Sequence, residues 1–405
     1  MKPPSRRPRI LVLNQYYWPG VEATARLLEE LCAALADDYD VTVITGMLHG
    51  VSPGETTHRG VRVIRVRSTA FDRRQLGLRA LNYLTYLAQS FRRAVGVPAP
   101  DAVLCMTDPP IIGNVALLVA RRFRVPMIVV SQDVFPEVAV ELGRIDNPFL
   151  ILILRRAINF YLRRADRVVA IGNTMRERLI DKGARSERIE VIPNWVDTDT
   201  IVPLTRGNEW AVEHGLADKF VVMHSGNVGH AQDLDALVRA ATFLRDLDDL
   251  RIVIIGAGAR HAEVVDLATR LDVDNVLFAP YQPREVLSQS LSTADVHVVG
   301  LARGLSGYVV PSRLYGIMSA GRPVIVSAED QSETAQLVRS VECGVVVPPG
   351  RAELLAGAMR DAYDGRLDLS EMGQRARAYV VQAGDTRWAI DRYRGLLTEL
   401  LGARS

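Results

Sequence analysis

A hydroxyl and a guanidinium stand side by side in the stretch GYVVPSRLYGIMSAGRPVIVS, which runs from Gly307 to Ser327. Ser312 and Arg313 come at the start of an apolar pattern that predicts a helix ending at Gly321. A helix N-terminus presents unpaired amide groups, and arginine binds phosphate oxygens in a bidentate manner. These two residues therefore predict a seat for a diphosphate. The alternative is a capping serine beside a solvated arginine.

The loop HSGNVGHAQ is a second candidate for phosphate binding, because it follows an apolar strand pattern and precedes a helical one. Gly226 and Gly229 allow backbone amides to face a phosphate. Asn227 and Gln232 can donate uncharged hydrogen bonds from their side chains. We interpret this loop as functional, against the alternative of a glycine-rich connector. The G-x-G sequence at 256–258 lacks a third glycine, and we interpret it as a tight turn.

Two residues in the first half of the chain are candidates for the reacting centre. In NQYYWPGVEATARLL, Gly20 belongs to a turn that opens a helix, and the helix N-terminus near 22–24 could seat an anion. The alternative is an ordinary turn with Thr24 as the cap. Asp133 ends an apolar strand pattern, so it could orient an acceptor hydroxyl or stabilise positive charge at a reacting carbon. Its alternative is a helix cap before Pro136.

The sequence gives no indication of a metal site or a cofactor. A D-x-D pair occurs in DTDT (197–200), and carboxylate pairs of this kind can hold a metal. This pair lies in an expected linker, so we interpret it as turn and capping residues. Cys32, Cys105 and Cys343 are far apart and odd in number, which suits buried thiols in a reducing compartment.

Alternating strand and helix patterns must position these residues. The first series of apolar runs predicts strands at 9–15, 40–46, 61–66, 102–106, 127–132, 167–172 and 189–194. The second series predicts strands at 220–226, 251–258, 275–281, 296–302, 323–327 and 344–349. Near-continuous apolar strands separated by helical patterns indicate parallel sheets covered on both faces.

The predicted fold class is therefore α/β, with two doubly wound Rossmann-like domains that face a cleft. The expected domains are 1–200, together with a final helix at 385–405, and 201–384. Ligands of open α/β sheets bind beyond the carboxyl ends of the strands, which is where the candidate residues fall.

Charge and hydropathy argue against a nucleic-acid-binding protein and against a membrane-spanning one. The net charge of +2 gives no case for nucleic acid as a partner, and the sequence has no run of eighteen apolar residues that would span a membrane. Two segments, 71–96 and 148–167, interleave arginine with leucine, tyrosine and phenylalanine. Such helices can lie on an anionic membrane surface, although a core helix with a solvated basic face is the alternative.

The order of motifs resembles that of family 4 glycosyltransferases over nearly the whole chain. The stretches that carry the resemblance are NQYYWPGVEATARLLEELCAALA, VIPNWVD, GNVGHAQDLDALVRAA, LFAPYQPREVLSQSLSTADVHVV and PSRLYGIMSAGRPVIVS. The first is similar to the subgroup that builds capsule and exopolysaccharide, including colanic-acid-type and fucosaminyl transferases. The resemblance implies the GT-B fold, retention of configuration and no bound metal.

By this resemblance the first domain receives the acceptor and the second holds a nucleotide sugar. Gly20 is expected near the donor phosphates, and Asp133 near the position of the family's active-site histidine or aspartate. Tyr281 and Leu314, which lie in two of the quoted stretches, join the expected donor-binding residues. The last helix, from about Asp385, is expected to cross back onto the first domain.

The sequence departs from the family pattern at its two glutamates, which have seven residues between them. Tyr308 and Gly316 stand in these places, so recognition of the donor ribose must differ here. The usual arginine and lysine of the phosphate loop fall at Asn227 and Gln232. Arg313 is therefore the main candidate for holding the diphosphate charge.

We expect a metal-independent hexosyltransferase that moves a sugar from a nucleoside diphosphate to a glycan or polyprenyl-linked acceptor in cell-surface polysaccharide synthesis. The expected location is cytoplasmic, with peripheral contact at the inner face of the plasma membrane. The alternatives are a catalytically inactive nucleotide-binding scaffold and an epimerase or inverting transferase of the same fold. Product analysis separates these alternatives.

Overall fold

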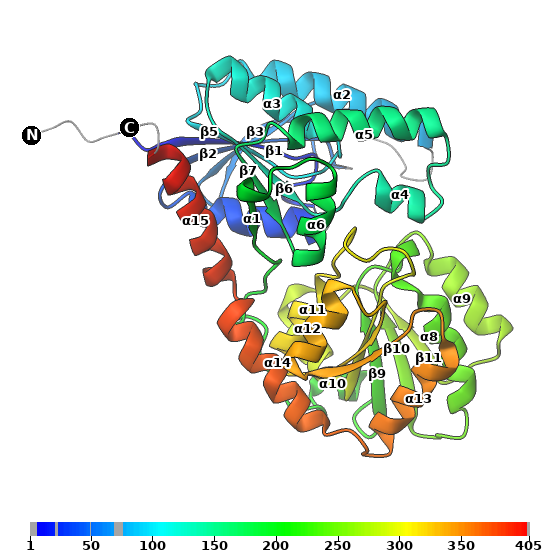
Figure 1. Cartoon of the computed structure of the whole chain (residues 1–405). Helices are drawn as coiled ribbons and strands as arrows, with labels where there is room; N and C mark the ends of the chain where they lie inside the picture. Colours follow the sequence, from blue (N-terminus) through cyan, green and yellow to red (C-terminus); the bar gives the residue numbers. More distant parts are fainter. Residues whose placement is uncertain (1–5, 21–22, 49, 69–75, 403–405) are drawn as a thin grey trace, which may run out of the picture. The chain divides into compact units, whose positions relative to one another are not determined.

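The computed structural model describes residues 6–20, 23–48, 50–68 and 76–402, except for the side chains of 76–80. The chain divides into two compact units, each with its own sheet (Figure 1). Unit 1 comprises the residues up to Pro193 and those from Ala389 onward, and unit 2 runs from Asn194 to Trp388.

The sheet of unit 1 has eight strands in the order β3-β4-β2-β1-β5-β6-β7-β8. All neighbouring strands are parallel except β3, which pairs antiparallel with β4 at the edge. The central strands are buried along their length, as expected for a sheet covered on both faces. The strands are β1 (Arg9–Leu13), β2 (Asp40–Thr45), β3 (Gly54–His58), β4 (Val61–Arg65), β5 (Ala102–Cys105), β6 (Met127–Ser131), β7 (Arg167–Ala170) and β8 (Ile189–Val191).

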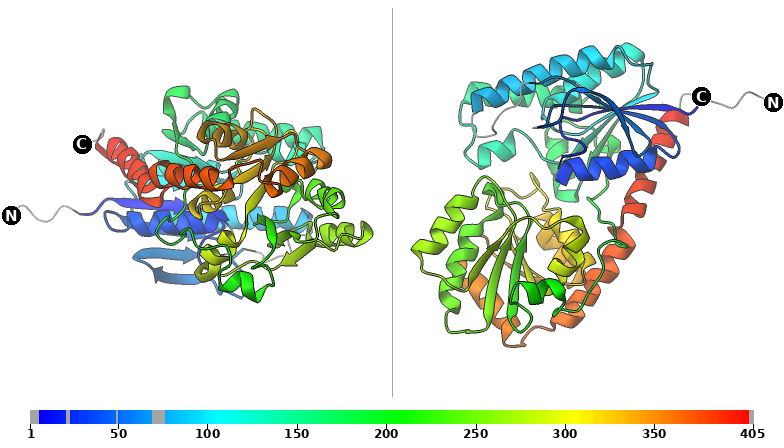
Figure 2. Two further views of the ribbon diagram at one scale, coloured as in Figure 1. Left: turned by 90° about the horizontal axis from the view of Figure 1, so that it is seen from below. Right: turned by 180° about the vertical axis from the view of Figure 1, so that it is seen from behind.

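Helices cover both faces of this sheet. In the views of Figures 1 and 2, α2, α3 and α5 lie side by side on one face, with α1 on the other. Helix α15 joins unit 1 from residue 389, where Arg394 bonds Asp38 at 2.9 Å and Arg392 pairs with Glu190. The helices are α1 (Ala23–Leu35), α2 (Leu76–Ala94), α3 (Ile112–Phe123), α4 (Glu137–Glu141), α5 (Pro148–Leu162), α6 (Asn173–Asp181), the short 3-10 helix η1 (Ser186–Arg188) and α15 (Thr386–Gly402).

The sheet of unit 2 has six parallel strands in the order β11-β10-β9-β12-β13-β14. The strands are β9 (Phe220–Ser225), β10 (Leu250–Ile255), β11 (Val276–Ala279), β12 (Val296–Gly300), β13 (Val324–Ser327) and β14 (Gly344–Val347). The helices are α7 (Glu209–Glu213), α8 (Leu234–Ala241), α9 (His261–Arg270), α10 (Leu287–Thr293), α11 (Arg313–Ser319), α12 (Glu333–Val341), α13 (Ala352–Tyr363) and α14 (Leu369–Ala383), with the 3-10 helices η2 (His230–Gln232), η3 (Thr242–Leu244) and η4 (Arg284–Val286).

Side chains from β9, β10 and β12 pack with those of α8, α9 and α13 to form one core of unit 2. Val222, Ile252 and Ile254 are completely buried in it, together with Leu237 and Met359 at 1% and 0% exposure. This core fixes the strands, and therefore holds the loops at their carboxyl ends in place.

The predicted fold class is confirmed in its strands, each of which is present with ends shifted by a few residues. The sequence GETTH of β3 was not predicted as a strand, because it has no apolar residue and gains its order from pairing with β4. Within the part of the chain that the structure describes, no helix has the length and apolar character needed to cross a membrane.

Candidate functional site

The loop after β9 is built by close backbone packing at the carboxyl edge of the unit 2 sheet. Gly226 has a φ of +145° and donates its amide to the carbonyl of Ile255 at 2.9 Å. A Cβ on Gly256 would lie 1.8 Å from the carbonyl oxygen of Gly226, and one on Gly258 would lie 2.2 Å from that of Val228. The G-x-G sequence therefore makes the turn predicted for it, and it serves to let two loops touch.

The guanidinium of Arg313 lies against this loop. A Cβ on Gly226 would lie 3.3 Å from the Cζ of Arg313. Only glycine at this position therefore allows the guanidinium to stay where it is. Nη1 of Arg313 donates to Nε2 of His224 at 2.7 Å. The structure thus brings together Gly226 and Arg313, two residues that lie far apart in the sequence.

His224 is a residue that the sequence analysis missed. It is completely buried at the end of β9, and burial together with the charge of Arg313 holds its pKa well below the usual value. The imidazole is therefore neutral and can accept the hydrogen bond from Arg313. In the sequence His224 appears as one polar residue in a strand pattern, and only the fold shows that it meets an arginine from α11.

Arg313 carries a charge without a counter-ion. Among the residues that the structure describes, no carboxylate forms an ion pair with it, and its hydrogen-bond partner is neutral. Burial lowers the pKa of Arg313 to about 10, which still leaves the group charged at neutral pH. A half-buried cation with no anion beside it is the arrangement expected of an anion-binding site.

The side chains of Asn227 and Gln232 close the loop on itself. Oε1 of Gln232 accepts from the amide of Gly229 at 3.0 Å and from Nδ2 of Asn227 at 3.4 Å. A Cβ on Gly300 would lie 2.1 Å from the carbonyl oxygen of Gln232, so the end of β12 also packs against this loop. The predicted binding loop is therefore a turn in which the side chains of Asn227 and Gln232 form hydrogen bonds within the loop.

The remaining predicted donor-binding residues of unit 2 lie on nearby segments. Tyr281 follows β11, is 53% exposed, and donates its hydroxyl to the carbonyl of Ala257 at 3.3 Å. Tyr308 lies in the loop after β12, where its amide bonds the carbonyl of Leu305 at 3.0 Å. Ser312 precedes α11 and its side chain does not cap the helix, contrary to the alternative for this residue. Leu314 is 2% exposed, so its side chain packs in the core of unit 2.

A carboxylate is present at this edge, although not at the family positions. Glu329 follows β13 and accepts from the hydroxyl of Ser306 at 2.8 Å and the amide of Gly304 at 3.3 Å. It thereby anchors the loop that leads to Tyr308. At Gly316 an added Cβ would meet only a methyl group of Leu291 at 3.8 Å, so local packing does not require glycine there.

Asp133 and Gly20 lie in unit 1. Asp133 follows β6 at the carboxyl edge and is exposed, while Pro136 and not Asp133 is the cap residue of α4. The helix-cap alternative for Asp133 is therefore wrong. Although much of the residue is in contact with solvent, neighbouring protein atoms desolvate its carboxyl group, and this desolvation together with the negative charge of Asp108 raises the pKa of Asp133 to about 7. Such a pKa fits a group that takes part in chemistry near neutrality.

Gly20 lies in a turn of unit 1. Its amide donates to the carbonyl of Tyr17 at 2.9 Å, so this N–H closes a turn and does not face a ligand. The proposed anion seat near 22–24 includes residues 21 and 22, which lie outside the described residues. Thr24 donates its hydroxyl to Oδ2 of Asp108 at 3.2 Å. This threonine therefore positions Asp108, whose negative charge raises the pKa of Asp133.

The D-x-D pair has a structural role. Asp197 accepts from the amides of Asp199 and Thr200 at 3.1 and 2.9 Å, and Arg284 reaches the same carboxylate at 3.3 Å. These contacts are those of turn and capping residues, as the sequence analysis interpreted them.

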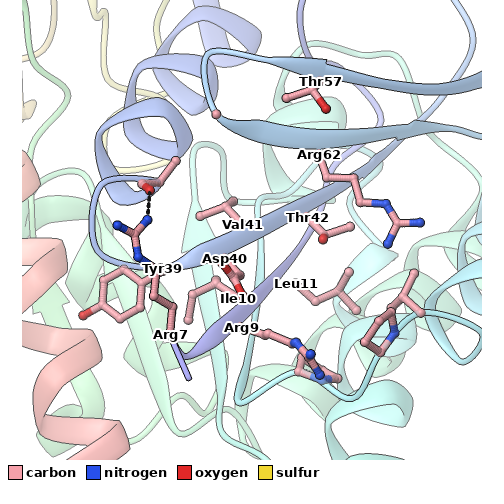
Figure 3. A pocket seen from close by; sticks show the side chains of 15 residues that line it. Arg7, Arg9, Ile10, Leu11, Tyr39, Asp40, Val41, Thr42, Thr57 and Arg62 are labelled. Carbon is pink, nitrogen blue, oxygen red and sulfur yellow. Dashed lines mark hydrogen bonds between the residues drawn. The ribbon is translucent and has the colours of Figure 1, made fainter. Parts of the chain in front are cut away.

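A cavity of about 320 Å³ lies elsewhere in unit 1, at the opposite edge of the sheet (Figure 3). Its lining includes Arg9 and Asp40, the first residues of β1 and β2, together with Arg7 and Arg62. The candidate residues Gly20 and Asp133 follow the carboxyl ends of the strands, whereas this cavity lies at the amino ends. The cavity is therefore separate from the candidate residues.

Two α/β units, each with a parallel or mainly parallel sheet and with polar and glycine-rich loops at its carboxyl edge, define the GT-B class of glycosyltransferases. Residues 22–195 match the family model "Glycosyl transferase 4-like domain", and residues 208–379 match "Glycosyl transferases group 1". The chain therefore belongs to the family of glycosyltransferases whose two domains these models describe.

Relatives agree with this assignment. WcaI of Escherichia coli K12, named as a glycosyl transferase of colanic acid biosynthesis, is 30% identical over 205 residues, which is half of each chain. WbjE of Pseudomonas aeruginosa, named as a glycosyltransferase, is 23% identical and covers 97% of this chain and 98% of its own. The structure of Anabaena HepE with UDP-glucose has a TM-score of 0.75 at 16% identity, over 96% of this chain and 99% of HepE.

Proposed function

We propose that the protein is a retaining glycosyltransferase that moves a hexosyl group from a nucleoside diphosphate sugar to a hydroxyl group. The acceptor is a glycan or a polyprenyl-linked saccharide in cell-surface polysaccharide synthesis. The single observation that carries the proposal is the charge of Arg313, which has no counter-ion among the described residues and lies against the Gly226–Gly229 loop of unit 2. The similarity to WcaI, which is named for colanic acid biosynthesis, supports a role in polysaccharide synthesis. The similarity to HepE, which was solved with UDP-glucose, supports a nucleoside diphosphate sugar as the donor.

Glycosyl transfer requires a site that stabilises the negative charge that develops on the leaving diphosphate. When the bond between the anomeric carbon and the diphosphate oxygen breaks, the electron pair goes to the diphosphate and the sugar becomes oxocarbenium-like. Arg313 and amides of the Gly226–Gly229 loop stabilise the added negative charge. The acceptor oxygen bonds the anomeric carbon on the same face, and its proton passes to the departing phosphate. No protein nucleophile is needed, so the missing glutamates do not prevent the reaction.

Asp133 of unit 1 also takes part in the proposed reaction. As a carboxylate it orients the acceptor hydroxyl or stabilises the positive charge of the oxocarbenium-like centre. The proposed reaction uses no metal ion, since Arg313 takes the place of a cation and Asp197 is held in a turn by backbone amides and Arg284. The proposed location is the cytoplasm, at the inner face of the plasma membrane.

The stereochemistry of the product tests the proposed reaction. A thermal-shift screen of nucleoside diphosphate sugars first identifies the donor, because a ligand of the native state raises the melting temperature. The donor is then incubated with protein and acceptor, and NMR follows the anomeric proton. Retention in the first-formed product is the expected result. An inverted anomer, an epimerised donor, or binding without transfer would each overturn the proposal in favour of one of the alternatives.

The rate is expected to depend on the ionisation of Asp133. Because the reactive form is the carboxylate and the pKa of Asp133 is about 7, kcat/KM should rise with pH through about 7 and level off above it. The Asp133→Asn variant should be slower by about 10²-fold and should lose this rise, since asparagine does not ionise. A steady-state pH profile of both proteins checks this, and an unchanged profile in the variant would assign the titration to another group.

A further inference from the structure

Arg65 is a buried cation of unit 1 that the proposed reaction does not use. It is the last residue of β4 and is 5% exposed. Its Nη1 donates to the carbonyl of Gly46 at 2.7 Å, and its Nη2 donates to the carbonyl of Trp18 at 2.5 Å. Gly46 follows β2 and Trp18 follows β1, so the guanidinium lies where the loops after three neighbouring strands meet.

The charge of Arg65 has no counter-ion. Among the described residues, no carboxylate forms an ion pair with it, and both of its hydrogen-bond partners are neutral carbonyl oxygens. Burial lowers the pKa of Arg65, because the charged form loses solvation. A buried charge without a partner is costly, unless a group of opposite charge is bound there. The folded protein thus holds a cation at a place that lacks its anion.

Two more exposed arginines of unit 1 do have carboxylate partners. Arg62, which stands three residues before Arg65 on the same strand, pairs with Glu55 at 2.6 Å. Arg155 pairs with Glu137 at 3.0 Å. Water solvates such exposed groups, so they need a partner less than a buried group does. The lack of a carboxylate beside the buried arginine is therefore a feature that requires an explanation.

Arg377 of unit 2 shows what a guanidinium does when its role is to tie loops together. It donates four hydrogen bonds, to the carbonyls of Thr198 and Ile201 and to the carbonyl and hydroxyl of Ser319. Arg65 donates two in the part of the chain that the structure describes, although a guanidinium has five N–H groups. Arg65 therefore keeps donors for a bound anion.

The surroundings of Arg65 are polar although they are buried. Gln15, which follows β1, is 2% exposed and donates its Nε2 to Oδ1 of Asn82 at 2.9 Å. Its Oε1 is buried and has no hydrogen-bond partner within the described ranges. A Cβ on Gly46 would lie 2.9 Å from Cγ of Gln15, so this side chain and the guanidinium both lie against Gly46. The loops after β1 and β2 thus hold unused donors beside an unused acceptor.

These residues lie at the same edge of the sheet as Asp133. Strand β5 alone separates β1 from β6, and the three strands are parallel. Ligands of open α/β sheets bind at this edge. In the proposed function the reacting hydroxyl of the acceptor lies at Asp133. Another group of the same acceptor would then reach the guanidinium of Arg65.

We propose that Arg65 binds an anionic group of the acceptor, separate from the hydroxyl that reacts. This inference rests on the proposed function and narrows the acceptor to a saccharide that bears a phosphate or a carboxylate. The diphosphate of a polyprenyl-linked saccharide and the carboxylate of an acidic glycan share this chemistry, since both accept paired hydrogen bonds from one guanidinium. The exposed Arg67 adds positive charge to the segment that follows β4.

Isothermal titration without donor tests this inference apart from the reaction. The probes are geranyl diphosphate, a disaccharide that ends in glucuronic acid, and the same disaccharide ending in glucose. The Arg313→Ala protein is titrated, so that the proposed donor site does not bind the diphosphate. We expect one of the two anionic probes to bind and the neutral one not to bind. Adding Arg65→Gln should weaken binding on the order of 30-fold, because contacts to a charged group are lost.

Two further variants control for structure. Arg62→Gln removes a charge from the same strand and should bind like the parent protein, because its guanidinium is already paired with Glu55. Arg65→Lys keeps the charge but loses the fork of donors, so an intermediate affinity is expected. If Arg65→Gln did not fold, as judged by circular dichroism and melting temperature, the comparison of Arg65→Lys with Arg62→Gln would decide.

The outcomes separate the two sources of the anion and the two proposals. Preference for geranyl diphosphate assigns the site to a lipid diphosphate, and preference for the uronate assigns it to an acidic glycan. Binding of neither anionic probe, or equal binding by the Arg65 and Arg62 variants, would overturn the inference. Binding through Arg65 by a protein that transfers no sugar would support the anion site and contradict the proposed reaction.

Discussion

The Arg313→Ala protein is expected to lose about 10³-fold in kcat/KM with its true donor. The guanidinium is the charged group placed against the glycine loop, and no carboxylate competes for it among the residues described. Its removal takes away a charge-assisted contact that strengthens as the diphosphate leaves, which corresponds to about 4 kcal/mol of transition-state stabilisation. Steady-state kinetics with the donor varied measures this, and the loss should fall on kcat as well as on KM.

Two matched variants complete this experiment. Arg313→Lys keeps the charge but loses the fork of donors, so an intermediate rate is expected. Arg239→Ala removes an exposed arginine of α8 and should leave the rate within about twofold. Near-normal turnover of Arg313→Ala, or an equal loss in both alanine variants, would remove Arg313 from the proposed mechanism.

The Gly256→Ala substitution is expected to destabilise unit 2 by about 3–5 kcal/mol and to abolish donor binding. The added Cβ would lie 1.8 Å from the carbonyl oxygen of Gly226, and the backbone φ of +138° is strained for alanine. The loop that carries Gly226 must move, and the contact with Arg313 moves with it. Urea unfolding gives the stability, and the thermal shift with donor gives the binding.

Gly357→Ala is the control for this substitution. Gly357 lies in α13, and an added Cβ would meet nothing within 4 Å. Alanine is the better helix former, so the variant should be stabilised by up to about 1 kcal/mol. If Gly256→Ala behaved like Gly357→Ala, the close packing of the two loops would not be what holds the site.

The fold could be predicted because each buried parallel strand corresponds to an unbroken run of apolar residues in the sequence. RILVL and MIVVS are such runs, and both became central strands of unit 1. GETTH was not predicted because its order depends on a neighbour and not on its own composition. Helix α11 ends at Ser319, and Gly321, with a φ of +66°, terminates it as predicted from the glycine.

The site was only partly predictable, because its contacts join residues that are distant along the chain. Arg313 and Gly226 were both singled out, yet the sequence could not show that they touch or that His224 of β9 contacts Arg313 of α11. Asn227 and Gln232 were predicted by residue type, while their use inside the loop depends on its three-dimensional path. Glu329 was missed because a single glutamate after a strand has no distinctive pattern.

A crystal structure of the protein with its nucleoside diphosphate bound tests the central proposal most directly. The predicted result is a phosphate oxygen within about 3 Å of the Arg313 guanidinium and a second phosphate contact to an amide of the Gly226–Gly229 loop. A diphosphate bound at another place, with Arg313 still directed only at His224, would contradict the proposal.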